Sequence, residues 1–141
     1  MCYSVYLSTS SPEDLTKHNS ELVRFRRPEP TDEKWTGLLR HEHKWFVGSK
    51  SQCGCTFRHF TTPDLGFTEP LDWSPEDEDN VQAAAELYRV IHELVSAGGQ
   101  VDCLDVWSDA KPEAIKEMAV KFDTISEKQF LLIENYHLLF E

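Results

Sequence analysis

The alternation of apolar and polar residues predicts several strands in the first half of the chain. Residues 2–10 alternate with a period of two, with Tyr3, Val5 and Leu7 on one side, and a period of two is typical of a strand. Residues 21–28 repeat the pattern and end at prolines. Residues 41–48 and 53–60 show it again on either side of a turn, so they are predicted to pair as a hairpin.

The second half combines a long helix with further strands. Apolar residues recur at helical spacing from about Pro75 to Ala97, and glycines follow as a stop. The segment Ser-Pro-Glu-Asp stands at 11–14 and again at 74–77, which predicts a serine cap and a proline in the first turn of two helices, the first one short. Residues 101–109 are apolar on both faces, which is typical of a strand covered on both sides, and the chain end is rich in strand pattern.

This order of elements predicts the fold class α+β within a single domain, residues 1–141. We expect an antiparallel or mixed β-sheet with two main helices packed on one face. A ferredoxin-like core followed by a β-rich C-terminal extension fits the same order. The start of the chain has neither a basic leader nor a long apolar run, so we expect no signal peptide, no membrane span and a cytoplasmic location.

The hairpin pattern decides how the cysteines of the run CGCTFRHF are interpreted. In the simplest register, which pairs Val47 with Cys53 and Trp45 with Cys55, the two cysteines share the more apolar face with Trp45 and Val47. They are then small core residues, as free cysteines often are. As zinc ligands they are separated by only one residue instead of two to four, and a disulfide between them is strained unless Gly54 bends the strand.

Three histidines fall at one end of the same predicted hairpin face. His41 and His43 lie two apart on one strand, and His59 faces them on the other. Three imidazoles in this arrangement can hold zinc or another divalent metal with an open position. The alternative is that they are exposed histidines at a hairpin end. We therefore expect no cofactor, with a metal at these histidines, or less favoured at Cys53 and Cys55, as the alternative.

The opposite face of the predicted sheet mixes basic and aromatic side chains. Such a face can neutralise phosphates and stack bases of a single-stranded nucleic acid. The residues concerned are Arg24, Arg26, Lys44, Phe46, Arg58 and Phe60. An acidic chain without an aromatic-glycine RNA-binding motif argues against this function.

The net charge of -11 is concentrated in the second half of the chain. Residues 1–70 hold nine basic and nine acidic residues, whereas residues 71–141 hold five basic and sixteen acidic ones. A run of acids begins the long helix at Glu76, Asp77, Glu78 and Asp79. This distribution suits a basic protein partner, although a solvated acidic surface is the simpler explanation.

The run from Gly48-Ser49 to Cys53-Gly54-Cys55-Thr56-Phe57, followed by an acidic helix and a β-rich end, resembles a family of small uncharacterised bacterial proteins with a similar strand motif. The resemblance implies a bacterial origin and adds no mechanism, because that family has no assigned function. The sequence has no Gly-rich phosphate loop, no G-x-S-x-G and no H-E-x-x-H. We therefore expect a non-catalytic, immunity- or adaptor-like protein-binding module, with metal binding and nucleic-acid binding as alternatives and the oligomeric state open.

Overall fold

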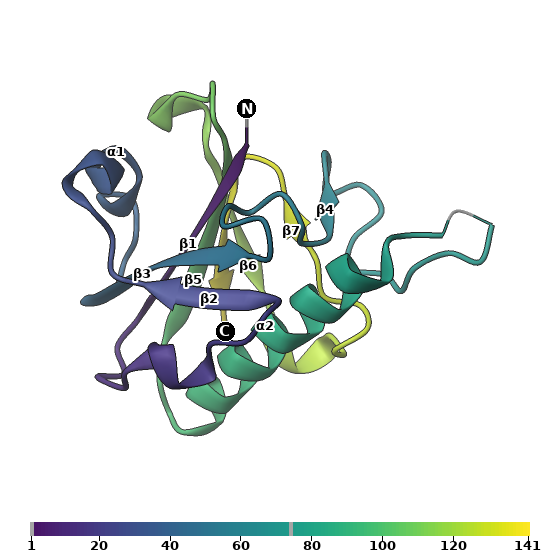
Figure 1. The fold of residues 1–141 in the computed structure, drawn as a ribbon, viewed down its shortest axis with the longest axis horizontal. Coiled ribbons are helices and arrows are strands. Elements are labelled where there is room, and N and C mark those ends of the chain that lie inside the picture. The colour runs from purple at the N-terminus through teal and green to yellow at the C-terminus, as the bar shows by residue number, and fades with distance from the viewer. Residues whose placement is uncertain (1, 74) are drawn as a thin grey trace.

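The computed structural model describes residues 2–73 and 75–141, and its main feature is a mixed sheet of six strands in the order β2-β3-β1-β5-β8-β6 (Figure 1). These strands are β1 (Tyr3–Thr9), β2 (Val23–Arg26), β3 (His43–Ser49), β5 (Val101–Trp107), β6 (Lys116–Val120) and β8 (Tyr136–Phe140). Two further short strands, β4 (His59–Phe60) and β7 (Leu132–Ile133), pair in parallel with each other. The helices are α1 (Glu33–Thr36) and α2 (Glu78–Ser96), with single 3₁₀ turns at Leu15–His18, Pro30–Asp32, Pro112–Ala114 and Phe122–Thr124.

The predicted α+β class is confirmed. The first four strands of the six-stranded sheet have the strand order of a ferredoxin-like core. Strands β2, β3, β1 and β5 lie side by side and every neighbouring pair among them is antiparallel. The 3₁₀ turn at Leu15–His18 and helix α2 occupy the two helical positions of the β-α-β-β-α-β order. Strand β8 then adds to the free side of β5, and β6 adds to β8 in parallel.

The sheet has an apolar layer on each face. Helix α2 packs on the first face, where its alanines and leucines meet alternate residues of the strands, among them Val5, Leu7 and Cys103. A smaller cluster on the second face gathers Tyr6, Phe46, Leu104 and Val106 under the α1 segment. Strand β5 is thus covered on both sides, as its sequence predicts.

The predicted hairpin of residues 41–48 and 53–60 is wrong. Strand β3 pairs with β1 and β2, and β4 pairs with β7. The chain turns away at the end of β3 because the backbone N–H of Ser49 donates to the carbonyl of Cys53 over 2.7 Å and Gln52 adopts a left-handed φ of 68°. Residues 50–58 therefore form a loop.

Both Ser-Pro-Glu-Asp segments cap a helical turn, but through the aspartate. The carboxylates of Asp14 and Asp77 each accept a hydrogen bond from the main-chain N–H two residues further on, over 3.0 Å and 2.8 Å. The predicted cap at Ser11 is therefore wrong, and Ser74 lies outside the described residues. An ionised side chain at this position also favours the positive end of the helix dipole of α2. No helix in the described ranges has the length and apolar composition of a membrane span.

Candidate metal centre

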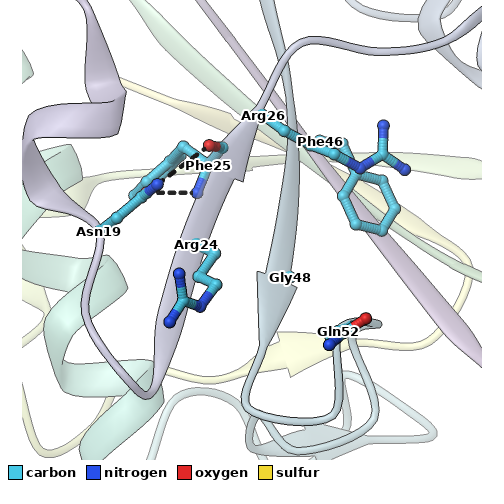
Figure 2. A pocket seen from close by; sticks show the side chains of 7 residues that line it. All are labelled: Asn19, Arg24, Phe25, Arg26, Phe46, Gly48 and Gln52. Atoms are coloured by element: carbon cyan, nitrogen blue, oxygen red, sulfur yellow. Dashed lines mark hydrogen bonds between the residues drawn. The ribbon is translucent and has the colours of Figure 1, made fainter.

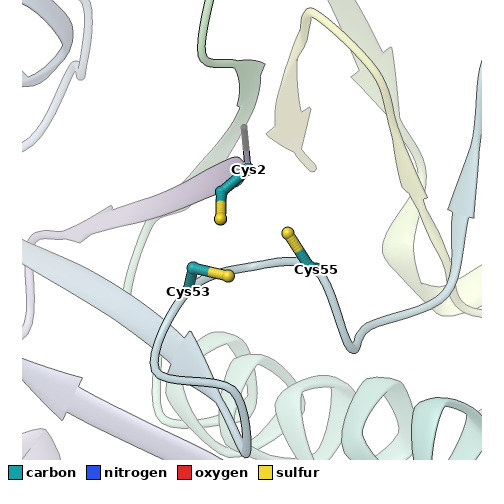
Figure 3. Close-up of side chains that lie close together, drawn as sticks. All are labelled: Cys2, Cys53 and Cys55. Atoms are coloured by element: carbon teal, nitrogen blue, oxygen red, sulfur yellow. The ribbon is translucent and has the colours of Figure 1, made fainter.

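Three cysteines meet where the loop after β3 passes the start of β1. The Sγ atoms of Cys2, Cys53 and Cys55 all lie within 4.8 Å of one another. Figure 3 shows the three side chains turned toward a common point, one from the residue before β1 and two from the loop. All three are free thiols and half-buried, whereas the fourth cysteine, Cys103, is buried in the main core.

Gly54 sets the position of this loop. Its N–H donates to the carbonyl of Tyr3 over 2.8 Å, which ties the loop to the first residue of β1. A Cβ at position 54 would lie 2.6 Å from Cγ2 of Val5, closer than real Cβ atoms approach, and 3.1 Å from the Tyr3 carbonyl oxygen, which is a tight contact. Only glycine therefore fits here, and its close approach brings both flanking cysteines beside Cys2.

A histidine whose side chain is only 8% exposed contacts the same glycine. Nε2 of His59 contacts the carbonyl oxygen of Gly54, and Nδ1 lies 2.7 Å from Oδ2 of Asp105. Because a carbonyl oxygen can only accept, Nε2 carries a hydrogen. The imidazole also stacks on the Tyr3 ring, with ring centroids 4.0 Å apart, and the Tyr3 hydroxyl donates to Glu134 over 2.7 Å.

Protonation of this pair follows from its burial and its hydrogen bond. Burial alone would lower the pKa of His59, but the hydrogen bond and the charge of Asp105 outweigh burial and raise it. Burial raises the pKa of Asp105 in spite of its bond to His59, and its Oδ1 has no hydrogen-bond partner among the described residues. Both directions mean that the pair keeps a shared proton, so His59 remains a donor to Gly54.

The thiols differ in acidity although they are close together. Burial would raise the pKa of Cys53, but hydrogen bonds from Ser51, from the backbone of Cys55 and from the neighbouring thiols lower it to about 7. Burial and the neighbouring Cys53 raise the pKa of Cys55 to about 12, against the N–H of Tyr3, which donates to its sulfur over 3.3 Å. Of these two thiols, Cys53 therefore ionises first. A cation that binds to Cys55 as well must displace the proton of that thiol.

The three histidines predicted as a metal site do not meet. His43 pairs with Thr9 at one end of β1, whereas His59 stacks on Tyr3 at the other end. Six positions along a strand correspond to about 20 Å. The backbone N–H of His41 donates to the Ser8 hydroxyl near the His43 end. The histidine metal site is therefore wrong, because it depended on the hairpin that does not form.

Part of the predicted basic and aromatic face does exist. Arg24, Arg26 and Phe46 line a cavity of about 420 Å³ beside β2 and β3, together with Asn19, Phe25, Gly48 and Gln52 (Figure 2). The Arg26 guanidinium lies 3.9 Å from the centroid of the Phe46 ring, and this ring is buried. Lys44 is half-buried on β3. Since the ring is covered, it offers no free surface for a base to stack on.

The other two members of that face lie elsewhere. Phe60 is in β4 and packs against the main core. The Arg58 side chain is buried, and its nitrogens donate to the Glu76 carboxylate over 2.8 Å and to the carbonyl oxygens of Thr68, Lys128 and Phe130. Arg58 thus fastens loops together inside the protein, and its placement on an outer sheet face was wrong.

Most of the acidic run at the start of α2 has partners within the chain. Glu76 pairs with Arg58, Asp77 caps the helix, and Asp79 lies 2.8 Å from the Lys50 ammonium. Glu78 is exposed in the first turn, where the helix dipole favours an acid. These carboxylates have structural roles, and their binding of a basic partner stays a prediction.

A second buried cluster lies on the opposite face of the sheet. Asp102 accepts hydrogen bonds from the Ser8 hydroxyl, from the backbone N–H of Arg40 over 3.0 Å and from Nε2 of His137. Nδ1 of His137 lies 3.5 Å from Glu117, at the edge of a cavity of about 370 Å³. The hydroxyl oxygen of Ser8 accepts a hydrogen bond from the backbone N–H of His41. The hydroxyl hydrogen of Ser8 is therefore free to point to Asp102.

Sequence reasoning missed the residues that complete both clusters. No pattern in the sequence places Cys2 beside Cys53 and Cys55, because the contact joins segments about fifty residues apart. Nor does the sequence pair Asp102 or Asp105 with a histidine. The signal that could have found them is the apolar pattern on both faces of residues 101–107, since a carboxylate inside a doubly covered strand must be buried and needs a donor.

Comparison with known proteins adds no relative: no family model, no curated protein and no solved structure matches the chain.

Proposed function

We propose that this protein binds a thiophilic metal ion through the thiolates of Cys2, Cys53 and Cys55. The observation that carries the proposal is the convergence of three Sγ atoms within 4.8 Å, from segments far apart in the sequence. Thiolates are the ligands of zinc, Cu⁺ and other soft metals. Three such ligands are enough to hold a metal ion.

The surroundings of the thiols support a binding site more than simple packing. A cysteine that serves only as a small apolar residue is expected inside the core, as Cys103 is. The three clustered cysteines are instead half-buried, so an ion can reach them. Their loop is held by the hydrogen bonds of Gly54 to Tyr3 and of His59 to Gly54, which lowers the entropy lost on binding.

Groups around the sulfurs also match what surrounds metal-bound thiolates. The N–H of Tyr3 donates to Cys55 over 3.3 Å, and the Ser51 hydroxyl lies 3.4 Å from the sulfur of Cys53. Such hydrogen bonds orient the ligands and spread their negative charge. The lowered pKa of Cys53 supplies a first thiolate near neutral pH.

Equilibrium dialysis of the reduced protein against Cd²⁺, used as a probe for thiophilic metals, tests the proposal. We expect one ion per chain in the wild type and in Cys103→Ala, the matched control with a thiol outside the cluster. Cys2→Ser, Cys53→Ser and Cys55→Ser should each lose the ion. Equal Cd²⁺ retention by these variants and the control would refute the proposal.

A further inference from the structure

Among the described residues, the side chains that converge as a candidate metal-binding group here offer sulfur alone, and this set of donor atoms narrows the choice of metal. The group that converges consists of Cys2, Cys53 and Cys55. Purely sulfur ligands favour the softest ions, and zinc accepts nitrogen and oxygen ligands equally well. The donor set by itself leaves zinc and Cu⁺ as the main choices.

The imidazole that contacts this loop already has two hydrogen-bond partners. His59 is the first residue of β4, and its Nδ1 is bonded to Asp105 and its Nε2 to the carbonyl of Gly54. Its side chain is only 8% exposed and is stacked on Tyr3. To become a fourth ligand it would have to break both hydrogen bonds and release the loop that positions the cysteines. His59 therefore supports the loop through Gly54, and the candidate site consists of three sulfur atoms.

The spacing of the two loop cysteines also favours a site with three sulfur ligands. Zinc-binding loops place two to four residues between paired cysteines, which lets the chain curl around a tetrahedral ion. Here one residue, Gly54, separates them, and its N–H is already bonded to the Tyr3 carbonyl. The two sulfurs can approach an ion from one side, and Cys2, the residue before β1, supplies the third sulfur (Figure 3). This is an arrangement for a three-coordinate ion.

We propose that the ion bound by these three cysteines is monovalent copper, Cu⁺, held by three thiolates; this proposal rests on the metal-binding function proposed above. Cu⁺ is soft and binds stably with three sulfur ligands, whereas Zn²⁺ in proteins almost always takes four ligands. Binding displaces the thiol protons of Cys55 and of its neighbours, and no electron is transferred. The protein would thus take up copper in its reduced form.

A competition between the two ions under anaerobic, reducing conditions tests this inference. The reduced protein is loaded with one equivalent of Cu⁺ and challenged with a hundredfold excess of Zn²⁺, and in parallel with the Cu⁺ chelator bathocuproine disulfonate. We expect Cu⁺ to stay bound against Zn²⁺ and to be given up to the chelator only at high chelator excess. X-ray absorption at the copper edge should show three sulfur neighbours.

Variants separate the choice of Cu⁺ from the proposal that the cluster binds a metal at all. Cys53→Ser should weaken Cu⁺ binding by more than about a hundredfold, which is the upper range for loss of a mere supporting group, and Cys103→Ala should leave it unchanged. Displacement of Cu⁺ by Zn²⁺, or a four-ligand copper spectrum, would overturn the choice of Cu⁺ while metal binding stands. Failure of the wild type to bind Cu⁺, Zn²⁺ or Cd²⁺ would overturn both proposals.

Discussion

Strand β5 carries two buried aspartates three positions apart, and each is bonded to a histidine on a different face of the sheet. Asp102 is bonded to His137, and Asp105 to His59. The surroundings of the two carboxylates differ. Asp102 also accepts hydrogen bonds from a hydroxyl and a backbone N–H, whereas Oδ1 of Asp105 has no partner within the described ranges.

The number of hydrogen-bond donors accompanies opposite shifts in the pKa values of the two carboxylates. Burial would raise the pKa of Asp102, but its hydrogen bonds from His137, Ser8 and Arg40 lower it. Burial raises the pKa of Asp105, because its single bond to a histidine does not compensate.

The two pairs also support different parts of the molecule. Asp102 binds the backbone of Arg40 and so holds the segment before β3 against the sheet. Asp105 holds His59, which holds Gly54 between the two loop cysteines. Changes near Asp105 should therefore alter metal binding, and changes near Asp102 should alter only stability.

The largest effect is expected at the glycine that the Asp105 pair supports. In Gly54→Ala the new methyl group meets Val5 at 2.6 Å, so the loop must move away from β1 and the thiols must separate. We expect Cd²⁺ affinity to fall by more than about a hundredfold, beyond the effect of losing one supporting group. Equilibrium dialysis measures it.

Gly37→Ala is the matched control for this substitution. Gly37 has an ordinary φ of -64°, and a Cβ there would contact only the Glu33 carbonyl oxygen at 3.5 Å. Its Cd²⁺ affinity should equal that of the wild type. If Gly54→Ala binds the ion as tightly as this control does, the close approach of the loop has no role in the site.

The next largest effect is a loss of stability on replacing Asp102, the carboxylate with three hydrogen-bond donors. Asp102→Asn places an amide among three hydrogen-bond donors and leaves His137 without its charged partner. Breaking a buried pair of this kind costs about 3–5 kcal/mol of unfolding free energy. Urea denaturation measures the loss, and Cd²⁺ affinity should stay unchanged. Lost metal binding in a folded Asp102→Asn protein would contradict the separation of the two regions.

Asp105→Asn should lower stability less than Asp102→Asn does, and it should also lower the affinity for metal. Its carboxylate has one partner and is disfavoured by burial, so the loss of stability should be smaller than for Asp102→Asn, at about 1–2 kcal/mol. Cd²⁺ affinity should fall by about tenfold, because His59 loses the group that orients it toward Gly54. An unchanged affinity together with a loss of stability would show that His59 has only a packing role.

Acid titration should separate the two aspartates by the sign of their effects. The folded pKa of Asp102 lies below its ordinary value of 3.8, so its ionisation stabilises the protein above that value, and this contribution is lost as the pH falls through the lower folded pKa. The advantage of the wild type over Asp102→Asn should therefore shrink in acid. For Asp105, whose pKa is raised, ionisation costs stability and the trend should reverse. Urea midpoints measured from neutral pH to below pH 3.8 provide the comparison, and equal trends for both variants would contradict it.

The smallest effect is expected at the exposed rim of the Asp102 region. Arg40 binds both carboxylate oxygens of Glu117 at 2.9 Å, and both side chains are 52% exposed. Exposed pairs contribute about 0–1 kcal/mol. Glu117→Gln should therefore change the urea midpoint slightly and metal affinity not at all, and a loss above that range would mean that Glu117 acts through His137.

The fold was largely predictable because its elements have clear local patterns. Helix α2 has an apolar stripe and a glycine stop, and the alternating strands specify an α+β sheet. The error at residues 53–60 arose because alternation also occurs in a loop, and the hydrogen bond from Ser49 to Cys53 that ends β3 leaves no periodic signal.

The site was predictable only in part, because it is built from contacts between distant segments. The sequence drew attention to Cys53, Cys55 and His59, and it identified a bend at Gly54 as the condition for special cysteine chemistry. The approach of Cys2 depends on the close packing of Gly54 against β1, a contact over fifty residues that no local pattern encodes. Likewise, the partner of His59 is an aspartate on the distant strand β5.

The most direct test of the metal site is an anaerobic titration of the reduced wild-type protein with Cd²⁺, followed by the ultraviolet charge-transfer absorption of metal-bound thiolates. We predict a linear rise that stops at one equivalent, with an amplitude of three thiolates per ion, from Cys2, Cys53 and Cys55. An absence of this absorption, or an unchanged rise in the triple serine variant of these residues, would contradict the account.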